Sequence, residues 1–133
     1  MSTGEWIPQD KAQQALNTDD LKKLAQISYE GKLATLADEL SPREQAELAA
    51  AMQAGREQWQ AAAEPLSDDE LLDLIKTLAI AEMELPNCNL GARSAVIHIN
   101  RLLKQRGRPL DEEALLWLKH HSSNRFLPNG PIL

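Results

Sequence analysis

Two five-residue stretches decide the fold: residues 40–44 read Leu-Ser-Pro-Arg-Glu, and residues 66–70 read Leu-Ser-Asp-Asp-Glu. In each stretch a serine stands three residues before a glutamate. The serine side chain can therefore cap a helix N-terminus while the glutamate reaches back to the serine backbone. The leucine before each serine favours the same start, as does the proline at the first helical position of the first stretch. The two stretches predict helices over 41–64 and 67–84, each ended by a following proline.

Weaker signals place further helices on both sides of these two. Pro8 can open a short helix, and Thr18 followed by two aspartates can cap the next one, which Gly31 would end. Gly107 separates two more helices near the other end of the chain. The expected elements are short helices over 8–40, helices over 91–106 and 111–121, and an ordered non-helical C-terminal tail over 122–133.

The composition favours helix over sheet. Apolar residues make up 43% of the chain, mostly leucine and alanine, while aromatic residues make up only 4%. A chain of 133 residues can bury a sizeable core without disulfides or metals, and the single Cys88 excludes an intramolecular disulfide. We expect one all-α domain over 1–133, a bundle of five to six helices.

No segment of the sequence has the pattern of a secretion signal or a membrane span. The N-terminus lacks a basic region followed by an apolar run, and charged residues interrupt the apolar stretch 71–85. We therefore expect a soluble, cytoplasmic protein that does not contact membranes.

The charge is divided unevenly along the chain. Residues 1–90 carry 17 acidic and 7 basic side chains, whereas residues 91–133 carry 3 acidic and 7 basic ones. A helical wheel of 91–106 places Arg93, Asn100, Arg101 and Lys104 opposite the apolar arc, with Ile97 exposed among them. Arg106, Arg108 and Arg125 could extend this basic face. It is a candidate surface for an anionic partner, although solvated cationic faces are common.

Nucleic acid is an improbable partner for this basic region. The helices over 91–106 and 111–121 could form a helix-turn-helix, but the second would present Asp111, Glu112 and Glu113 at its N-terminus. Three carboxylates there would be repelled by the phosphate backbone.

Metal or acid–base chemistry would depend on a small set of side chains. Glu82 falls on the apolar side of its helix, and His98, His120, His121 and Cys88 complete the set. Their spacing matches no metal motif, and adjacent histidines on a helix point about 100° apart. We predict no catalytic, cofactor-binding or metal-binding residues. An enzyme that uses Glu82 with the histidines remains an alternative.

The helix over 41–64 carries a narrow apolar seam around Trp59. Its positions alternate spacings of four and three, as in helix pairs that pack closely. The seam can pack on the chain's own bundle or pair across a homodimer. It consists of Leu48, Met52, Gly55, Trp59, Ala62 and Leu66.

The C-terminal tail combines apolar side chains with turn-forming residues. Leu127 and Pro128 begin a sequence that fits a β-turn, and Arg125 and Phe126 precede it. Such a segment either folds back on its own bundle or docks in a groove of another chain.

These observations predict a small non-enzymatic interaction or adaptor protein whose partner is either an unidentified protein or a second copy of the chain in a homodimer. Its contacts would be made by the tail, the basic face or the Trp59 seam. The alternatives are binding of an anionic ligand or nucleic acid on the basic face, and a metal-dependent or acid–base enzyme.

Overall fold

The computed structural model describes residues 16–85, 88 and 94–121, and every regular element in them is helical. The all-α prediction is therefore confirmed. Within these ranges there are seven α-helices and one short 3-10 helix, more than the five to six helices predicted. They are α2 (Thr18–Tyr29), the 3-10 helix η1 (Leu33–Thr35), α3 (Leu36–Glu39), α4 (Pro42–Met52), α5 (Arg56–Ala63), α6 (Asp68–Glu84), α7 (Ala95–Gln105) and α8 (Glu112–His121).

Both predicted capping boxes are present. The backbone N–H of Glu44 donates to the Ser41 hydroxyl at 3.1 Å, and the Ser41 N–H donates to the Glu44 carboxylate at 2.9 Å. Ser67 and Glu70 repeat the arrangement with the same two distances. Each box satisfies two backbone donors that a helix N-terminus would otherwise leave without partners.

The predicted single helix over 41–64 is wrong, because the chain divides it into α4 and α5. The first helix ends at Met52 and the second begins after the N-cap Gly55. Glycine has low helix propensity, so a break there costs little. The break lets α5 turn back so that the Trp59 indole, which is fully buried, donates to the Ala51 carbonyl at 3.1 Å.

The start of α2 also differs from the prediction. Asn17, one residue before the predicted cap, is the N-cap, and its side chain accepts a hydrogen bond from the Asp20 N–H at 2.9 Å. The Thr18 hydroxyl instead donates to the Ala62 carbonyl at 2.7 Å, which ties α2 to α5. At its other end α2 stops at Tyr29, and Gly31 adopts a positive φ of 74° as the chain leaves the helix.

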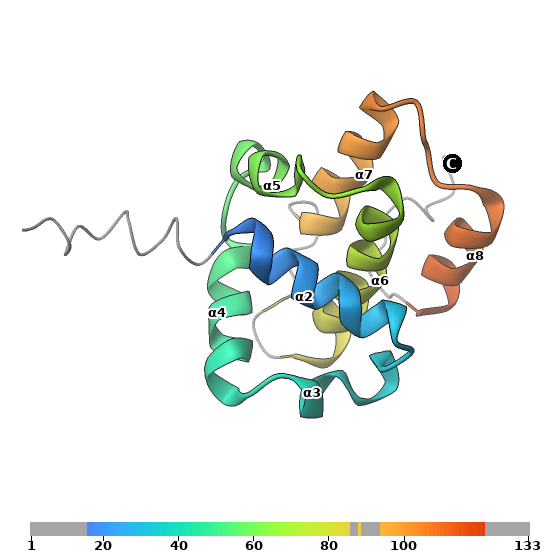
Figure 1. Cartoon of the computed structure of the whole chain (residues 1–133). Helices are drawn as coiled ribbons and strands as arrows, with labels where there is room; N and C mark the ends of the chain where they lie inside the picture. The colour runs from blue at the N-terminus through green and yellow to red at the C-terminus, as the bar shows by residue number, and fades with distance from the viewer. Residues whose placement is uncertain (1–15, 86–87, 89–93, 122–133) are drawn as a thin grey trace, which may run out of the picture.

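Helix α6 is the central element of the core. Figure 1 shows α2 crossing it, and the two helices form the most extensive contact between elements of the described structure. The Thr77 hydroxyl of α6 donates to the Leu24 carbonyl of α2 at 2.7 Å, and the Ser28 hydroxyl of α2 donates to Asp73 at 2.8 Å. The fully buried leucines of α6 form the centre of the core: Leu71, Leu74 and Leu78.

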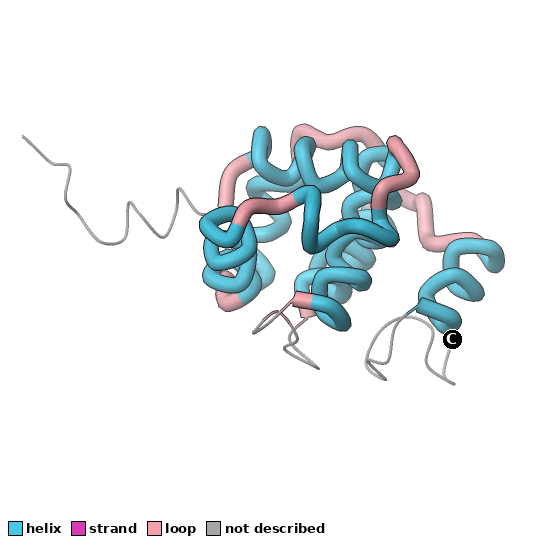
Figure 2. The backbone as a smooth tube through the Cα atoms, turned by 90° about the horizontal axis from the view of Figure 1, so that it is seen from below, coloured by secondary structure: helices cyan, strands magenta, loops and turns pink. Residues whose placement is uncertain are grey.

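The remaining helices surround this central pair. Helix α7 packs on α5 and α6, begins after the N-cap Ser94, and ends before Gly107, whose φ is 76°. Helix α8 contacts α6, and Figures 1 and 2 place it at the opposite end of the molecule from α4. The predicted first short helix, the predicted helix start at Gly91 and the tail over 122–133 lie outside the described residues.

No helix in the part of the chain that the structure describes is both long enough and apolar enough to cross a membrane.

Candidate functional site

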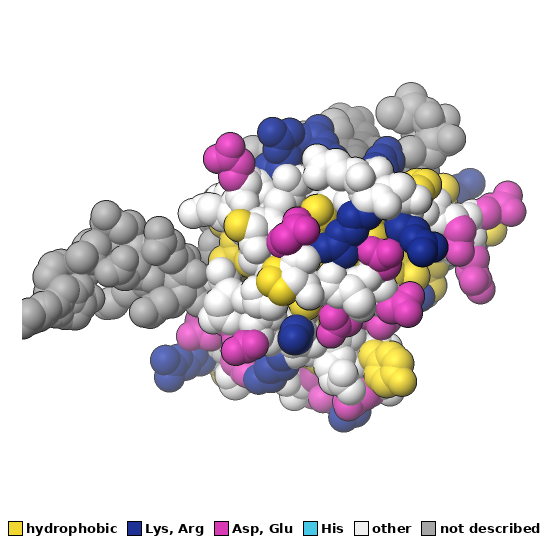
Figure 3. Space-filling model, turned by 45° about the horizontal axis from the view of Figure 1, so that its top comes forward, with side chains coloured by type: hydrophobic (Ala, Val, Ile, Leu, Met, Phe, Trp, Pro, Cys, Tyr) yellow, Lys and Arg dark blue, Asp and Glu magenta, His cyan; other side chains and the backbone are white. Residues whose placement is uncertain are grey.

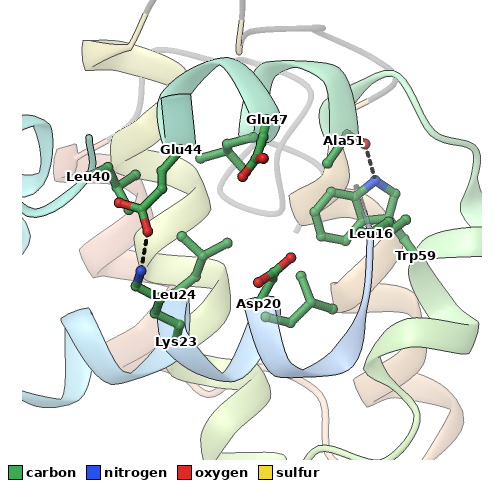
Figure 4. A pocket seen from close by; sticks show the side chains of 11 residues that line it. Leu16, Asp20, Lys23, Leu24, Leu40, Glu44, Glu47, Ala51 and Trp59 are labelled. Carbon is green, nitrogen blue, oxygen red and sulfur yellow. Dashed lines mark hydrogen bonds and ion pairs between the residues drawn. The ribbon is translucent and has the colours of Figure 1, made fainter. Parts of the chain in front are cut away.

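A recess in the described structure lies between α2 and α4. Its space measures about 470 Å³ when the open solvent at its mouth is included. Its floor is apolar, whereas its rim carries charged side chains (Figure 4). We call it the α2–α4 groove. Its lining residues are Leu16, Asp20, Leu21, Lys23, Leu24, Leu40, Glu44, Glu47, Leu48, Ala51 and Trp59.

Helical periodicity builds the floor of the groove. Leu21 and Leu24 lie three residues apart on α2, and Leu48 and Ala51 lie three residues apart on α4, so each pair occupies one helix face. Trp59 of α5 closes one end, and its Nε1–H donates a hydrogen bond to the Ala51 carbonyl. No polar atom of the indole is therefore available to an occupant, and the floor favours apolar groups.

The rim of the groove is predominantly acidic. Asp20 and Lys23 stand on α2, facing Glu44 and Glu47 on α4 (Figure 4). Lys23 donates a hydrogen bond to Glu44 across the mouth, which raises the pKa of Lys23 and lowers the pKa of Glu44. Glu47 pairs with Arg43 at 3.3 Å on the exposed surface of α4. The lining holds three carboxylates and one lysine, and Arg43 beside Glu47 reduces the net charge of the rim to −1.

The predicted Trp59 seam does not form a continuous helix surface for pairing across a dimer. Trp59 has no exposed area, Leu48 and Met52 are buried, and all three belong to the core of this chain. The break between α4 and α5 removes the continuous helix on which the seam depended. The seam residues therefore pack within their own chain, which is one of the two uses predicted for them.

Part of the predicted basic face is present, and α5 extends it. Arg101 and Lys104 are exposed on α7, and Arg56 at the start of α5 joins Arg101 around a shallow hollow. Among the described residues, none of these three side chains forms an ion pair. Figure 3 shows the molecule with the top of Figure 1 turned toward the viewer. On this side lysine and arginine side chains lie among aspartate and glutamate side chains. Arg93 and Arg125 lie outside the described residues.

Three other predicted positions on this face are corrected. Ile97 is half-buried and packs against the core, and Asn100 is only 6% exposed. Both were expected to face solvent, but α7 is covered by α5 as well as by α6, so its buried arc is wider than the wheel indicated. Arg106 points back to the α5–α6 connection, where it donates to the Glu64 and Leu66 carbonyls at 2.7 and 2.8 Å.

Buried polar groups gather where α6 ends and α7 begins. Glu82 is 4% exposed and accepts a hydrogen bond from the Ser94 hydroxyl, which itself accepts from the Val96 N–H at 3.1 Å. Cys88 is 1% exposed. Burial, together with the negative charge of Glu82, raises the pKa of the Cys88 thiol to about 11. The thiolate, the nucleophilic form, is therefore scarce at neutral pH.

The three histidines are not gathered into one site with Glu82. His98 lies on α7, whereas His121 ends α8, stacks on Trp117 with ring centroids 4.3 Å apart, and shares a 2.8 Å hydrogen bond with the Trp117 carbonyl. His120 precedes it and is exposed. In the described part of the chain no three histidine, cysteine, aspartate or glutamate side chains are placed to hold a metal ion.

The α2–α4 groove is the site that sequence reasoning missed. The apolar faces of α2 and α4 could be identified from spacing alone, but the sequence did not indicate that the two faces meet. The residues Phe126, Leu127 and Pro128, which were predicted to bind a partner, lie outside the described residues.

No protein-family model, curated protein or solved structure matches this chain.

Proposed function

We propose that this chain is a small non-enzymatic interaction protein whose α2–α4 groove binds an apolar peptide segment that carries basic side chains. The observation that carries the proposal is the combination of an apolar floor with a predominantly acidic rim. Peptide-binding grooves commonly take apolar anchors in the floor and gain specificity from charges at the edge. A cytoplasmic location and a protein partner remain predictions.

The floor supports an apolar anchor rather than a polar one. A polar group placed there would lose its hydrogen bonds to water, and the buried leucines offer none in exchange. The rim supports basic flanks because Asp20, Glu44 and Glu47 outnumber Lys23. An acidic peptide would meet like charge at the mouth of the groove.

The proposal is tested with the full chain and three peptides that share two adjacent large apolar residues. Their flanks are arginine, glutamine or glutamate, and binding is followed by amide chemical shifts in an NMR titration. We expect the arginine peptide to shift signals of α2 and α4, and the glutamate peptide to bind at least about tenfold more weakly. Glu47→Lys should reduce this preference, whereas Asp38→Lys, the same charge change on α3 outside the groove, should not. Shifts confined to other helices would contradict the proposal.

A second candidate function is binding of an anionic ligand at the hollow between α5 and α7. The observation that favours it is a hollow lined by Arg56 and Arg101, with Glu57 as its one acidic residue among the described residues. Burial, together with the positive charges of Arg101 and Arg56, lowers the pKa of His98. Titration with polyglutamate should give binding that weakens steeply with salt and is lost in the Arg56→Gln, Arg101→Gln double variant. Binding that is unchanged by that variant would exclude this hollow.

A further inference from the structure

We infer that the occupant of the α2–α4 groove is the segment around Arg125, Phe126 and Leu127 from a second copy of this chain. The inference rests on the proposed function, because it names the partner of the same groove. It would make the protein a homodimer in which each copy inserts its C-terminal segment into the other.

The chemistry of the segment complements that of the groove. Residues 122–133 contain four large apolar residues and one cation, Arg125, and no acidic residue. Phe126 and Leu127 supply two adjacent apolar anchors, and Arg125 directly before them can approach the carboxylates of the rim. Pro128 directly after them restricts the backbone, which reduces the entropy lost when the segment is ordered.

The N-terminal segment matches the groove less well. Residues 1–15 also hold three large apolar side chains, Met1, Trp6 and Ile7, but their side chains include two acidic groups against one basic group. Their net negative charge would be repelled by a rim that is itself acidic. Charge therefore favours the C-terminal segment over the N-terminal one.

The distance that the segment can span argues for a second copy. Phe126 is five residues beyond His121, the end of α8, and five residues reach at most about 18 Å. Helix α8 packs on α6, α6 packs on α2, and the groove lies beyond α2. With helix axes spaced by about 8–10 Å, the direct path is about 20–25 Å through the packed interior, and any path around the surface is longer.

Figures 1 and 2 show α8 and α4 at opposite ends of the molecule. Five residues beyond α8 are therefore too few to bring Phe126 into the groove of the same chain. The segment can enter the groove of a neighbouring copy, and the same contact made in the other direction closes a two-fold dimer. One exchange provides two identical contacts, so a small groove can support association that a single contact would not.

The experiment is sedimentation velocity of the full chain over a wide concentration range, with charge-reversal variants. We expect a concentration-dependent dimer of the unaltered chain. Arg125→Glu and Glu47→Lys should each weaken dimerisation at least about tenfold, because each places like charges together. The dimer dissociation constant of the combined variant should return to within about threefold of that of the unaltered chain, since the attraction is restored with the signs of the two charges exchanged.

Matched controls separate this contact from a general effect of charge. Lys119→Glu, at an exposed position of α8, repeats the charge change of Arg125→Glu, and Asp38→Lys repeats that of Glu47→Lys. Both should dimerise as the unaltered chain does. Circular dichroism of each variant establishes that the helices remain folded.

Three results would overturn the inference. The first is a chain that stays monomeric at every concentration. Its groove would then take either the segment of the same chain or a foreign peptide, and not the segment of a second copy. The second is a dimer that neither reversal weakens, and the third is a combined variant that fails to recover. If the arginine peptide still shifts α2 and α4 signals in any of these cases, the groove binds peptides and only the identity of its occupant is wrong.

Discussion

At the scale of single residues, burial decides the chemistry of the one cysteine. Cys88 lies between two asparagines in the sequence, a setting typical of an exposed loop, yet its side chain is almost completely buried. The sequence could not reveal this, because the residues that cover a loop come from elsewhere in the chain. A buried thiol with a raised pKa behaves as a small apolar group.

We expect native Cys88 to react slowly with a thiol-specific disulfide reagent. At pH 8 a thiol with a pKa of about 11 is about one-thousandth ionised, whereas one with the ordinary value of 9.0 is about one-tenth ionised. The native rate should therefore be at least about 100-fold lower than the rate in guanidinium chloride, measured by the absorbance of the released thiolate. Equal rates would show that the thiol is accessible and ordinary.

His98 should make stability depend on pH. Burial, Arg101 and Arg56 all lower its pKa in the folded protein, so the unfolded chain binds the proton more readily. Stability is therefore complete above the unfolded value of about 6.5 and decreases as the pH falls through it. We expect His98→Gln to reduce the change in melting temperature between pH 7.5 and 5. His120→Gln, at an exposed position of α8, serves as the control. If His98→Gln leaves the difference in melting temperature between the two pH values unaltered, His98 does not have this role.

At the scale of elements, local signals predicted where helices begin better than how far they run. The capping boxes at Ser41 and Ser67 form as expected because every group they need lies within four residues. The break at Gly55 could not be predicted with the same security. The apolar spacing continues through it, and only the burial of Trp59 against α4 makes two short helices better than one long helix.

Removal of the Ser67 hydroxyl should destabilise the whole fold, because it caps the central helix α6. We expect Ser67→Ala to lower the free energy of unfolding by about 1 kcal/mol, measured by urea denaturation. Ser67→Thr retains a hydroxyl oxygen that can accept from Glu70 and should restore most of the loss. If both variants lose equal stability, the effect does not come from the cap.

At the scale of the whole molecule, a single arginine joins segments that are 40 residues apart in the sequence. Arg106, at the end of α7, donates to the carbonyls of Glu64 and Leu66 and to Asp68 at 3.0 Å. It was interpreted from the sequence as part of the basic face. Its actual role is to satisfy carbonyl groups in the connection between α5 and α6, so α7 also fixes the approach of α5 to the core.

We expect Arg106→Met to lower the free energy of unfolding by about 1–3 kcal/mol, because it removes a donor from the partly buried Leu66 carbonyl as well as from the exposed Glu64 carbonyl. Arg108→Met is the matched control. Arg108 is exposed and makes one contact of 3.4 Å with Asp68, so its loss should change stability by less than about 1 kcal/mol. Urea denaturation of both variants measures the difference, and equal effects would contradict the role assigned to Arg106.

Short-range chemistry in the sequence determined the all-α class, most helix ends and the apolar faces of the helices. Caps, glycines and helical periodicity act over a few residues, so they can be identified without knowledge of the fold. Only the tertiary structure decided that Trp59 is buried, that Arg56 joins Arg101, and that α2 and α4 border a common groove. These features depend on contacts between segments distant in sequence, and the periodicity of one helix does not specify which other helix covers it.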